Sequence, residues 1–246
     1  MATPQLIRTL VFLGGHDLAR IEQVAAAGPD AICIDLEDST PLAKKDAART
    51  LFGEAVAAIT AAGALVVVRT NMPGAGEDED LAAVMCPQLH AVSLPKVESA
   101  EAVQTYDETV ARAERAAGLE PGAVLIRPII ETAQGVRMAY EISAASPRVA
   151  YLGGVEGGIF GDLGGSLGYV QTDNGMETFF LRSKVLIDAR AAGVPFPIGG
   201  GMTTRRDADG ARSFARENRI LGYNGVHCAA DPEVIKAVND EFTPDR

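Results

Sequence analysis

The 246-residue sequence has no tryptophan, only three cysteines, and few aromatic residues, which make up 5% of the chain. Cys33, Cys86 and Cys228 lie far apart and form no Cys-x-x-Cys pair, so they favour a reduced, cytoplasmic compartment over a disulfide framework. No apolar run approaches the roughly 18 residues of a membrane helix, and the first residues do not resemble a signal peptide. We therefore expect no membrane partner.

Positive charge is also scarce in this sequence. Lys and Arg number 22 against 33 Asp and Glu, which gives a net charge of −11. Because binding to phosphate groups requires positive potential, this balance argues against a nucleic-acid or anionic-membrane surface. The hydrophobic content of 47% and the charged content of 22% are ordinary for a folded chain and exclude intrinsic disorder.

Short apolar runs alternate with longer helix-like segments along the whole chain. The runs are nearly continuous in apolar character, as strands are when both faces of a parallel sheet are buried. They cover residues 10–13, 31–34, 65–68, 91–94, 124–130, 149–152 and 194–198, with a weak eighth run near 225–228. The helix-like segments cover 17–27, 41–62, 99–117, 132–145, 176–192, 205–221 and 232–242, and a short helix follows an acidic loop within 71–87.

About eight strand–helix units in 246 residues predict one (β/α)8 TIM barrel, an α/β fold that forms a single domain over residues 1–246. An open doubly wound sheet is the alternative. It would favour fewer strands and a Gly-x-Gly-x-x-Gly turn after the first strand, where this chain has Gly14-Gly15-His16-Asp17. The barrel is therefore the better interpretation.

Charged residues come directly after most of the predicted strands. Because the strands of a barrel all run in one direction, the residues that follow them meet at one mouth, where such enzymes build their sites. Several carboxylates gathered with Arg and Lys are costly to desolvate unless a ligand such as a divalent metal and an anionic substrate binds there. The charged residues concerned are Asp35, Glu37, Asp38, Arg69, Lys96, Glu131, Glu156 and Asp162, and His16 and His227 could also reach the mouth.

Most of these charged residues also have an ordinary structural interpretation, although Glu37, between Asp35 and Asp38, has none of its own. Asp35 and Asp38 could cap the next helix, and Arg69 could form an ion pair at the rim, as could the lysine after the fourth strand. Glu131 precedes a helix whose dipole favours an acid, and Asp162 could be a turn residue. These interpretations become less convincing when all the residues follow strand ends.

The types of donor at the mouth indicate a hard cation. Two carboxylates with water and substrate oxygens suit Mg²⁺, which usually takes one or two protein carboxylates and keeps several waters. His16, His90 and His227 are dispersed and show no zinc-ligand spacing. The sequence also has no Gly-x-Ser-x-Gly elbow and no P-loop.

Several motifs follow the same strand ends. The most specific is Asp35-Leu36-Glu37-Asp38-Ser39 with Lys45 and Arg49 after it, and the others are Arg8-Thr9-Leu10-Val11-Phe12, Val68-Arg69-Thr70-Asn71, Leu94-Pro95-Lys96-Val97-Glu98-Ser99, Ile129-Ile130-Glu131-Thr132-Ala133 and Phe242-Thr243-Pro244. In these motifs the sequence resembles the HpcH/HpaI aldolase–citrate lyase β-subunit superfamily, and specifically its CitE-like branch of CoA-ester lyases. The resemblance extends over nearly the whole chain.

The resemblance implies that Glu131 and Asp162 bind Mg²⁺, with Mn²⁺ as an alternative ion and Glu156 as a rival to Asp162. It implies that Arg69 holds a carboxylate or carbonyl oxygen of a short oxo acid, and that the backbone around Gly161 and Asp162 donates to the substrate carboxylate. His16 is a further candidate for substrate binding. A metal ion would polarise the carbonyl and stabilise the enolate formed when the adjacent carbon–carbon bond breaks.

The remaining site residues receive supporting roles from the same resemblance. Asp35, Glu37 and Asp38 would form an acidic shell near the metal-bound water, and Lys96 would act electrostatically, since metal chemistry needs no Schiff base.

The implied substrate is a short 2-oxo acid, a 3-hydroxy acid or its CoA thioester. The sequence ends at Arg246, without the C-terminal lid expected of longer CoA-ester lyases, which leaves the use of CoA open. A thioester hydrolase or decarboxylase, or a non-catalytic or carrier-dependent subunit of a citrate-lyase-like complex, is the alternative. A homo-oligomer, a trimer or hexamer, is expected from the family.

Overall fold

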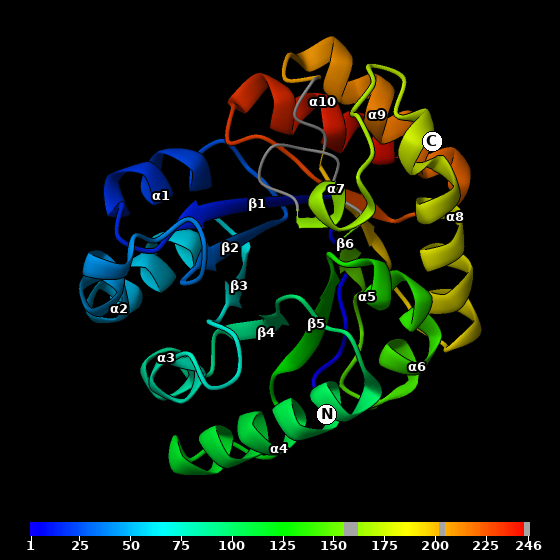
Figure 1. Cartoon of the computed structure of the whole chain (residues 1–246). Coiled ribbons are helices and arrows are strands. Elements are labelled where there is room, and N and C mark those ends of the chain that lie inside the picture. Colours follow the sequence, from blue (N-terminus) through cyan, green and yellow to red (C-terminus); the bar gives the residue numbers. More distant parts are fainter. Residues whose placement is uncertain (155–161, 202–204, 244–246) are drawn as a thin grey trace.

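Eight parallel strands form the centre of the computed structural model, which describes residues 1–154, 162–201 and 205–243 (Figure 1). Their hydrogen-bonded order is β6-β5-β4-β3-β2-β1-β8-β7, so each strand lies beside the next one in the chain. Backbone bonds from Phe196 N to Ala150 O (3.3 Å) and from Ile198 N to Leu152 O (3.0 Å) join the two ends of this series. The predicted (β/α)8 barrel is confirmed.

The strands are shorter at the end of the chain than at its beginning. They are β1 (Thr9–Gly14), β2 (Ala31–Asp35), β3 (Leu65–Arg69), β4 (Leu89–Leu94), β5 (Leu125–Ile130), β6 (Gly153–Gly154), β7 (Ile198–Gly199) and β8 (Gly225–His227). The sixth predicted run, 149–152, precedes β6, because it makes only isolated backbone contacts such as the bridge between Val149 and Ile126. The seventh run contributes only its last residue, Ile198, to β7.

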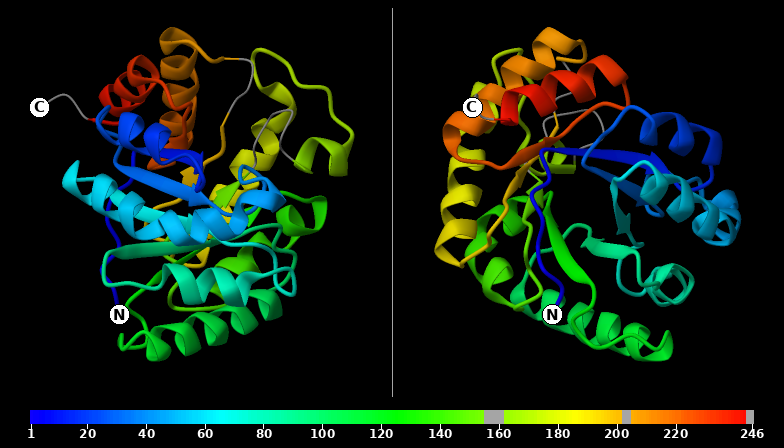
Figure 2. Two further views of the ribbon diagram at one scale, coloured as in Figure 1. Left: turned by 90° about the vertical axis from the view of Figure 1, so that its left-hand side faces the viewer. Right: turned by 180° about the vertical axis from the view of Figure 1, so that it is seen from behind.

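Helices surround the strands, as Figures 1 and 2 show. They are α1 (Leu18–Ala25), η1 (Leu42–Lys44), α2 (Lys45–Ala61), α3 (Glu77–Val84), α4 (Ala100–Ala116), α5 (Ala133–Arg137), α6 (Ala139–Ala144), α7 (Asp162–Leu167), α8 (Met176–Ala191), α9 (Ala208–Leu221) and α10 (Pro232–Phe242). The helix predicted over 132–145 is wrong in one respect, because Met138, at φ −97° and ψ 16°, separates α5 from α6. Gly135 lowers the helix propensity of this stretch.

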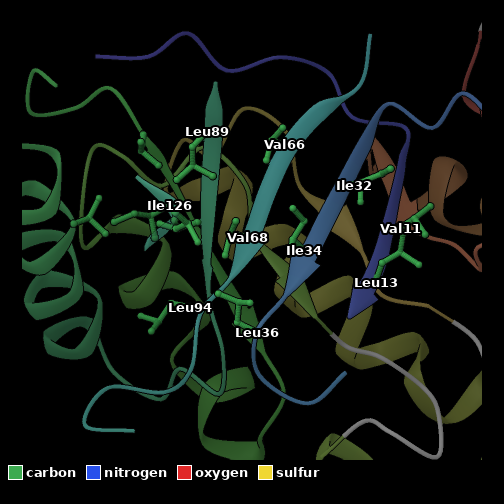
Figure 3. Packing of buried hydrophobic residues seen from close by; sticks show 14 of the residues in the cluster. Val11, Leu13, Ile32, Ile34, Leu36, Val66, Val68, Leu89, Leu94 and Ile126 are labelled. Carbon is green, nitrogen blue, oxygen red and sulfur yellow. The ribbon is translucent and has the colours of Figure 1, made fainter. Parts of the chain in front are cut away.

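Alternation along the strands divides the core into two layers, because successive side chains of a strand point to opposite faces. One set packs between strands and helices and includes Val11, Ile32, Ile34, Val66 and Val68, which Figure 3 shows. The other set fills the barrel, and it includes Leu10, Ala31, Cys33, Val67, Ala91 and Leu125, all at most 1% exposed. Every second residue further along these strands, counted from the members of this second set, therefore also points into the barrel.

The end of the barrel where the strands begin is closed by the N-terminal segment, which lies across the strands in the right-hand view of Figure 2. The hydroxyl of Tyr151 donates to the carbonyl of Gln5 (2.7 Å) and is bonded to Nε2 of His90 (2.7 Å). Burial lowers the pKa of His90. A ligand that enters the barrel must therefore use the opposite end. Within the described ranges, no helix has the length and apolar character that crossing a bilayer requires.

Candidate active site

Strand register aligns four polar residues inside the barrel. Asp35 is paired with Arg69, Arg69 with Ser93, and Ser93 with Arg127 across four neighbouring strands. Partners in a parallel ladder face the same side of the sheet, so this row lies directly above the apolar layer of the barrel interior. The row forms the floor of the mouth.

Asp35 holds Arg69 in one orientation. The Nε and Nη2 groups of Arg69 donate to Oδ1 and Oδ2 of Asp35 at 2.8 and 2.6 Å, while the backbone N–H groups of Glu37 and Ser39 donate to the same two oxygens. Burial raises the pKa of Asp35, but the bonds from Arg69 and Ser39 outweigh it and hold the pKa below its usual value. The Asp35 carboxylate therefore stays ionised, with four donors already on its oxygens.

The third nitrogen of Arg69 faces the mouth. Its Nη1 lies 3.0 Å from Glu37 Oε2, 3.6 Å from Glu131 Oε1 and 3.7 Å from Asp38 Oδ2. The guanidinium also lies over the ring of Phe12, 5.2 Å from its centroid. Acids that follow β2 and β5 thus converge on one N–H group.

Lys96 links the same acids from the loop after β4. Its Nζ donates to Glu37 Oε1 at 2.8 Å, and its backbone N–H donates to Glu131 Oε2 at 3.2 Å. The φ of Lys96 is 51°, a left-handed value that among the described residues only this non-glycine adopts. Such a conformation costs about 1 kcal/mol or more and persists where the surrounding structure imposes it.

Negative charge exceeds positive charge at this cluster. The ion pairs of the mouth join two cations, Arg69 and Lys96, to four acids. These acids are Asp35, Glu37, Asp38 and Glu131. Burial raises the pKa of Glu37, and the charges of Arg69 and Lys96 offset this effect only in part. With Arg127 in the row below counted as well, the acids still outnumber the cations, and an excess of negative charge in a partly buried cluster suits a divalent cation.

The described part of the chain supplies one of the predicted metal ligands, Glu131, which is 7% exposed. No group of three or more His, Cys, Asp or Glu side chains among the described residues could hold a metal ion. Asp162 begins α7, but its side chain is outside the described residues, as are Gly161 and Glu156. Because Mg²⁺ commonly takes one or two protein carboxylates, Glu131 with one acid from this loop fits the ion. The choice between Asp162 and Glu156 remains a prediction.

His16 lies beside the loop after β2, which carries Glu37, Asp38 and Ser39. A Cβ atom on Gly14 would come within 2.8 Å of His16 Cε1 and 2.5 Å of the Ser39 carbonyl, so only glycine lets the ring approach the loop. Its Nδ1 is buried and has no hydrogen-bond partner among the described residues. The structure thus places His16 near the mouth, and its contact with substrate stays a prediction.

Sequence reasoning missed Arg127, which occupies the middle of β5 and is 1% exposed. Its Nη1 donates to Ser93 Oγ at 3.4 Å, and its Nη2 contacts Nε2 of His227. Gly153 gives it room, because a Cβ atom there would lie 1.9 Å from Arg127 Nη2. A charged residue within an otherwise apolar strand was the signal that could have revealed this contact.

Asp80 is a second residue that sequence reasoning missed. It is fully buried, and its Oδ2 accepts from both the backbone N–H and Nδ2 of Asn71 at 2.7 Å. Arg49 donates to its other oxygen at 2.9 Å, and Lys45 donates to Asn71 Oδ1. These contacts fix the loop after Arg69. Asp80 sits in a run of four acids, which by itself indicates a solvated surface.

A family model described as HpcH/HpaI aldolase/citrate lyase matches residues 8–231, which include every residue of the cluster. The chain belongs to this family. The citrate lyase subunit beta of Leuconostoc mesenteroides subsp. cremoris is 30% identical over 99% of this chain and 79% of its own length. The mitochondrial citramalyl-CoA lyase of Homo sapiens is 26% identical over 96% of this chain and 71% of its own length.

A solved structure of the family agrees with both the sequence and the fold. The protein CitE from Mycobacterium tuberculosis, in complex with magnesium, acetoacetate and coenzyme A, has a TM-score of 0.75 and 26% identity, with 98% of this chain and 82% of that chain covered. The resemblance drawn from the strand-end motifs is confirmed, and as a member of the HpcH/HpaI aldolase/citrate lyase family the chain is a lyase.

Proposed function

We propose that this HpcH/HpaI family member is a Mg²⁺-dependent carbon–carbon lyase that acts on a short 2-oxo acid, a 3-hydroxy acid or its CoA thioester. The observation that carries the proposal is the convergence of Glu37, Asp38 and Glu131 on one N–H group of Arg69. The CitE complex with magnesium, acetoacetate and coenzyme A supports both the ion and the class of substrate.

Glu131 is the residue that would hold the ion, together with Asp162 or, alternatively, Glu156. The surplus of negative charge around Arg69 and Lys96 supports a divalent cation over a monovalent one. When bound, Mg²⁺ supplies a Lewis acid that polarises the carbonyl and stabilises the negative charge that develops beside it.

Arg69 is the group that would bind the substrate. Asp35 holds two of its nitrogens, so Nη1 remains to donate to a carboxylate or carbonyl oxygen at the mouth. Asp35 is then a positioning residue, since its oxygens already accept four hydrogen bonds and it is fully buried. The family resemblance instead implies that Asp35 belongs to an acidic shell near a metal-bound water, which is a different role.

Lys96 would orient the acids of the mouth. Its ammonium is bonded to Glu37 and its backbone N–H to Glu131, an arrangement that suits electrostatic work and not Schiff-base formation. We propose that the residue that transfers the proton is Glu37 or Asp38, the two acids that form ion pairs with Lys96 Nζ. The backbone at Gly161 and Asp162, with His16, is proposed to hold the substrate carboxylate.

Product analysis tests the proposed reaction. The protein with Mg²⁺ is incubated with malyl- and citramalyl-type CoA thioesters, and separately with pyruvate and an aldehyde, and the products are identified by mass spectrometry. Formation of a 2-oxo acid and an acyl-CoA, or of an aldol adduct, supports a carbon–carbon lyase. Release of free CoA with an intact carbon skeleton, or of CO₂, indicates the hydrolase or decarboxylase alternative instead.

The name of the Leuconostoc relative, a citrate lyase subunit, supports one further candidate, a lyase that needs an acyl carrier. Such a chain would bind pyruvate in a Mg²⁺-dependent manner yet show no turnover with free CoA thioesters. Turnover that appears only when the same acyl group is carried on an acyl carrier protein would establish this form.

A further inference from the structure

A groove lies outside the cluster of the mouth, between the first half of α8 and the end of α9. Its volume is about 400 Å³, and apolar side chains make up most of its lining. Met176, Phe179 and Ile220 are 73%, 56% and 73% exposed, which is unusual for large apolar side chains that lie together. Concave, mostly apolar sites of this size that contain a few polar groups are typical of small-molecule binding.

Arg182 lines the same groove and is the polar group within it. It is 2% exposed, and its Nε and Nη1 are buried with no hydrogen-bond partner in the part of the chain that the structure describes. Among the described residues, its guanidinium gives one hydrogen bond, a long one of 3.3 Å from Nη2 to the carbonyl of Gly175, and the group also lies 5.6 Å from the ring centroid of Phe214. Two donors of a buried cation are therefore unused.

The acids near Arg182 are engaged elsewhere. Glu217 Oε2 lies 4.0 Å from Arg182 Nη2, beyond hydrogen-bond distance, while Glu217 Oε1 accepts from Arg205 Nη1 at 2.6 Å. Glu177 accepts from both the backbone and the hydroxyl of Thr172. Burial accordingly lowers the pKa of the Arg182 guanidinium. A buried cation without a bonded anion is unfavourable, and a ligand that brings an anion relieves this.

We propose that the α8–α9 groove is a binding site for an amphipathic carboxylic acid, whose carboxylate accepts from Arg182 and whose apolar body packs on Phe179 and Ile220. A single negative charge suits the site, because the Glu217 carboxylate, whose Oε2 lies 4.0 Å from Arg182 Nη2, would repel a second one. Water does not reach Nε and Nη1, so a lining side chain shifts on binding. Met176 and Phe179 can do so without disturbing the core, since both are largely exposed.

Calorimetric titration with octanoate, with octan-1-ol as the uncharged control, tests the proposal. Octanoate should bind the unmodified protein, and octanol should bind at least about tenfold more weakly, because a charge-assisted hydrogen bond distinguishes them. R182M keeps the length of the side chain and removes the buried charge, so the fold is retained. This variant should lose about 10- to 100-fold in affinity for octanoate and none for octanol.

A matched pair of surface variants keeps the test decisive. Ile220 lines the groove, whereas Ile187 on α8 does not, and the two are 73% and 66% exposed. I220D should weaken octanoate binding because it adds a negative charge beside the carboxylate, and I187D should leave it unchanged.

Three results would overturn the proposal. The first is equal affinity for octanoate and octanol, which would describe a purely apolar groove. The second is binding of octanoate that R182M does not reduce. The third is no binding at all while both aspartate variants convert an oligomer to smaller species by light scattering, which would identify this face as a contact between copies of the chain.

Discussion

At the scale of single residues, Arg69 has two tasks that a lysine could not combine. Two of its nitrogens are bonded to Asp35, and the third faces the acids of the mouth. A guanidinium holds these directions at once because it is planar, whereas an ammonium is a point charge with rotating donors. The orientation of the substrate-binding N–H group therefore depends on a residue that does not touch substrate.

Arg69→Lys should weaken substrate binding while the chain stays folded. We expect the dissociation constant for pyruvate, measured by calorimetry with Mg²⁺ present, to rise about 10- to 100-fold, because one charge-assisted bond is lost. Lys236→Gln is the control: it removes an exposed cation from α10, where Lys236 bonds Asp240 and not the acids of the mouth. An unchanged constant in Arg69→Lys would remove the residue from substrate binding.

Lys96 allows its backbone to be tested apart from its side chain. Both Lys96→Ala and Lys96→Gly remove the bond to Glu37, but only glycine adopts a φ of 51° without strain. The glycine variant should therefore be more stable than the alanine variant by about 1 kcal/mol in urea unfolding. Equal stabilities would show that the left-handed conformation is not maintained in solution.

At the scale of elements, the contact between β5 and β6 depends on Gly153. Gly153→Ala should lower the free energy of unfolding by about 2 kcal/mol or more, since its Cβ would lie 1.9 Å from the Arg127 guanidinium. Gly53→Ala on α2 is the control, because nothing lies within 4 Å of its added Cβ, and it should stabilise the chain by about 0.5–1 kcal/mol. Urea denaturation measures both values.

The attachment of α4 to the barrel predicts a sensitivity to acid. Glu114 is fully buried, accepts from both Nη groups of Arg148 at 2.7 Å, and accepts from the backbone N–H groups of Gly122 and Val124. Burial raises the pKa of Glu114, but Arg148 and the backbone bonds outweigh it, so the folded pKa lies below the usual value of 4.5. The stabilisation is complete above the unfolded pKa and is lost as pH falls through the folded pKa.

Glu114→Gln should consequently flatten the dependence of stability on pH in the acid range. Urea midpoints measured between about pH 6 and pH 3 should fall less steeply in this variant than in the unmodified chain. Glu120→Gln, at an exposed position nearby, should leave the slope as it was. A slope that is identical in all three proteins would contradict the assignment.

Sequence alone predicted most of the helices and strands, and it placed the ends of the first five strands at one mouth. Parallel strands bring their carboxyl ends together, so Arg69 and Glu131 could be placed at one mouth before their 3.6 Å separation was known. The partners of each side chain could not be predicted, because they depend on strand register and rotamers. Arg127 and Asp80 were missed for this reason, since one interrupts an apolar strand and the other lies in a run of acids.

At the scale of the whole molecule, the charge surplus of the mouth links metal binding to stability. A ligand that binds only the folded chain raises its melting temperature by mass action. Mg²⁺ should therefore raise the melting temperature of the unmodified protein and not that of Glu131→Gln, whereas Glu98→Gln, an exposed neighbour, should respond like the unmodified protein.

Sodium chloride at matched ionic strength is the necessary control, because the chain carries a net charge of −11 and any salt screens its self-repulsion. A Mg²⁺ effect that sodium chloride reproduces, or that persists in Glu131→Gln, would show that Glu131 is not a ligand.

The N-terminal segment, which is bonded to Tyr151, and the apolar layer above it close one end of the barrel, so the interior is open to solvent only at the mouth. A cleavage reaction generates two fragments from one molecule, and here both must depart by the route along which the next reactant arrives. The fragment that stays bound at Arg69 for longer occupies the position that the next substrate needs. In steady-state kinetics the slower fragment should behave as a competitive inhibitor of the substrate.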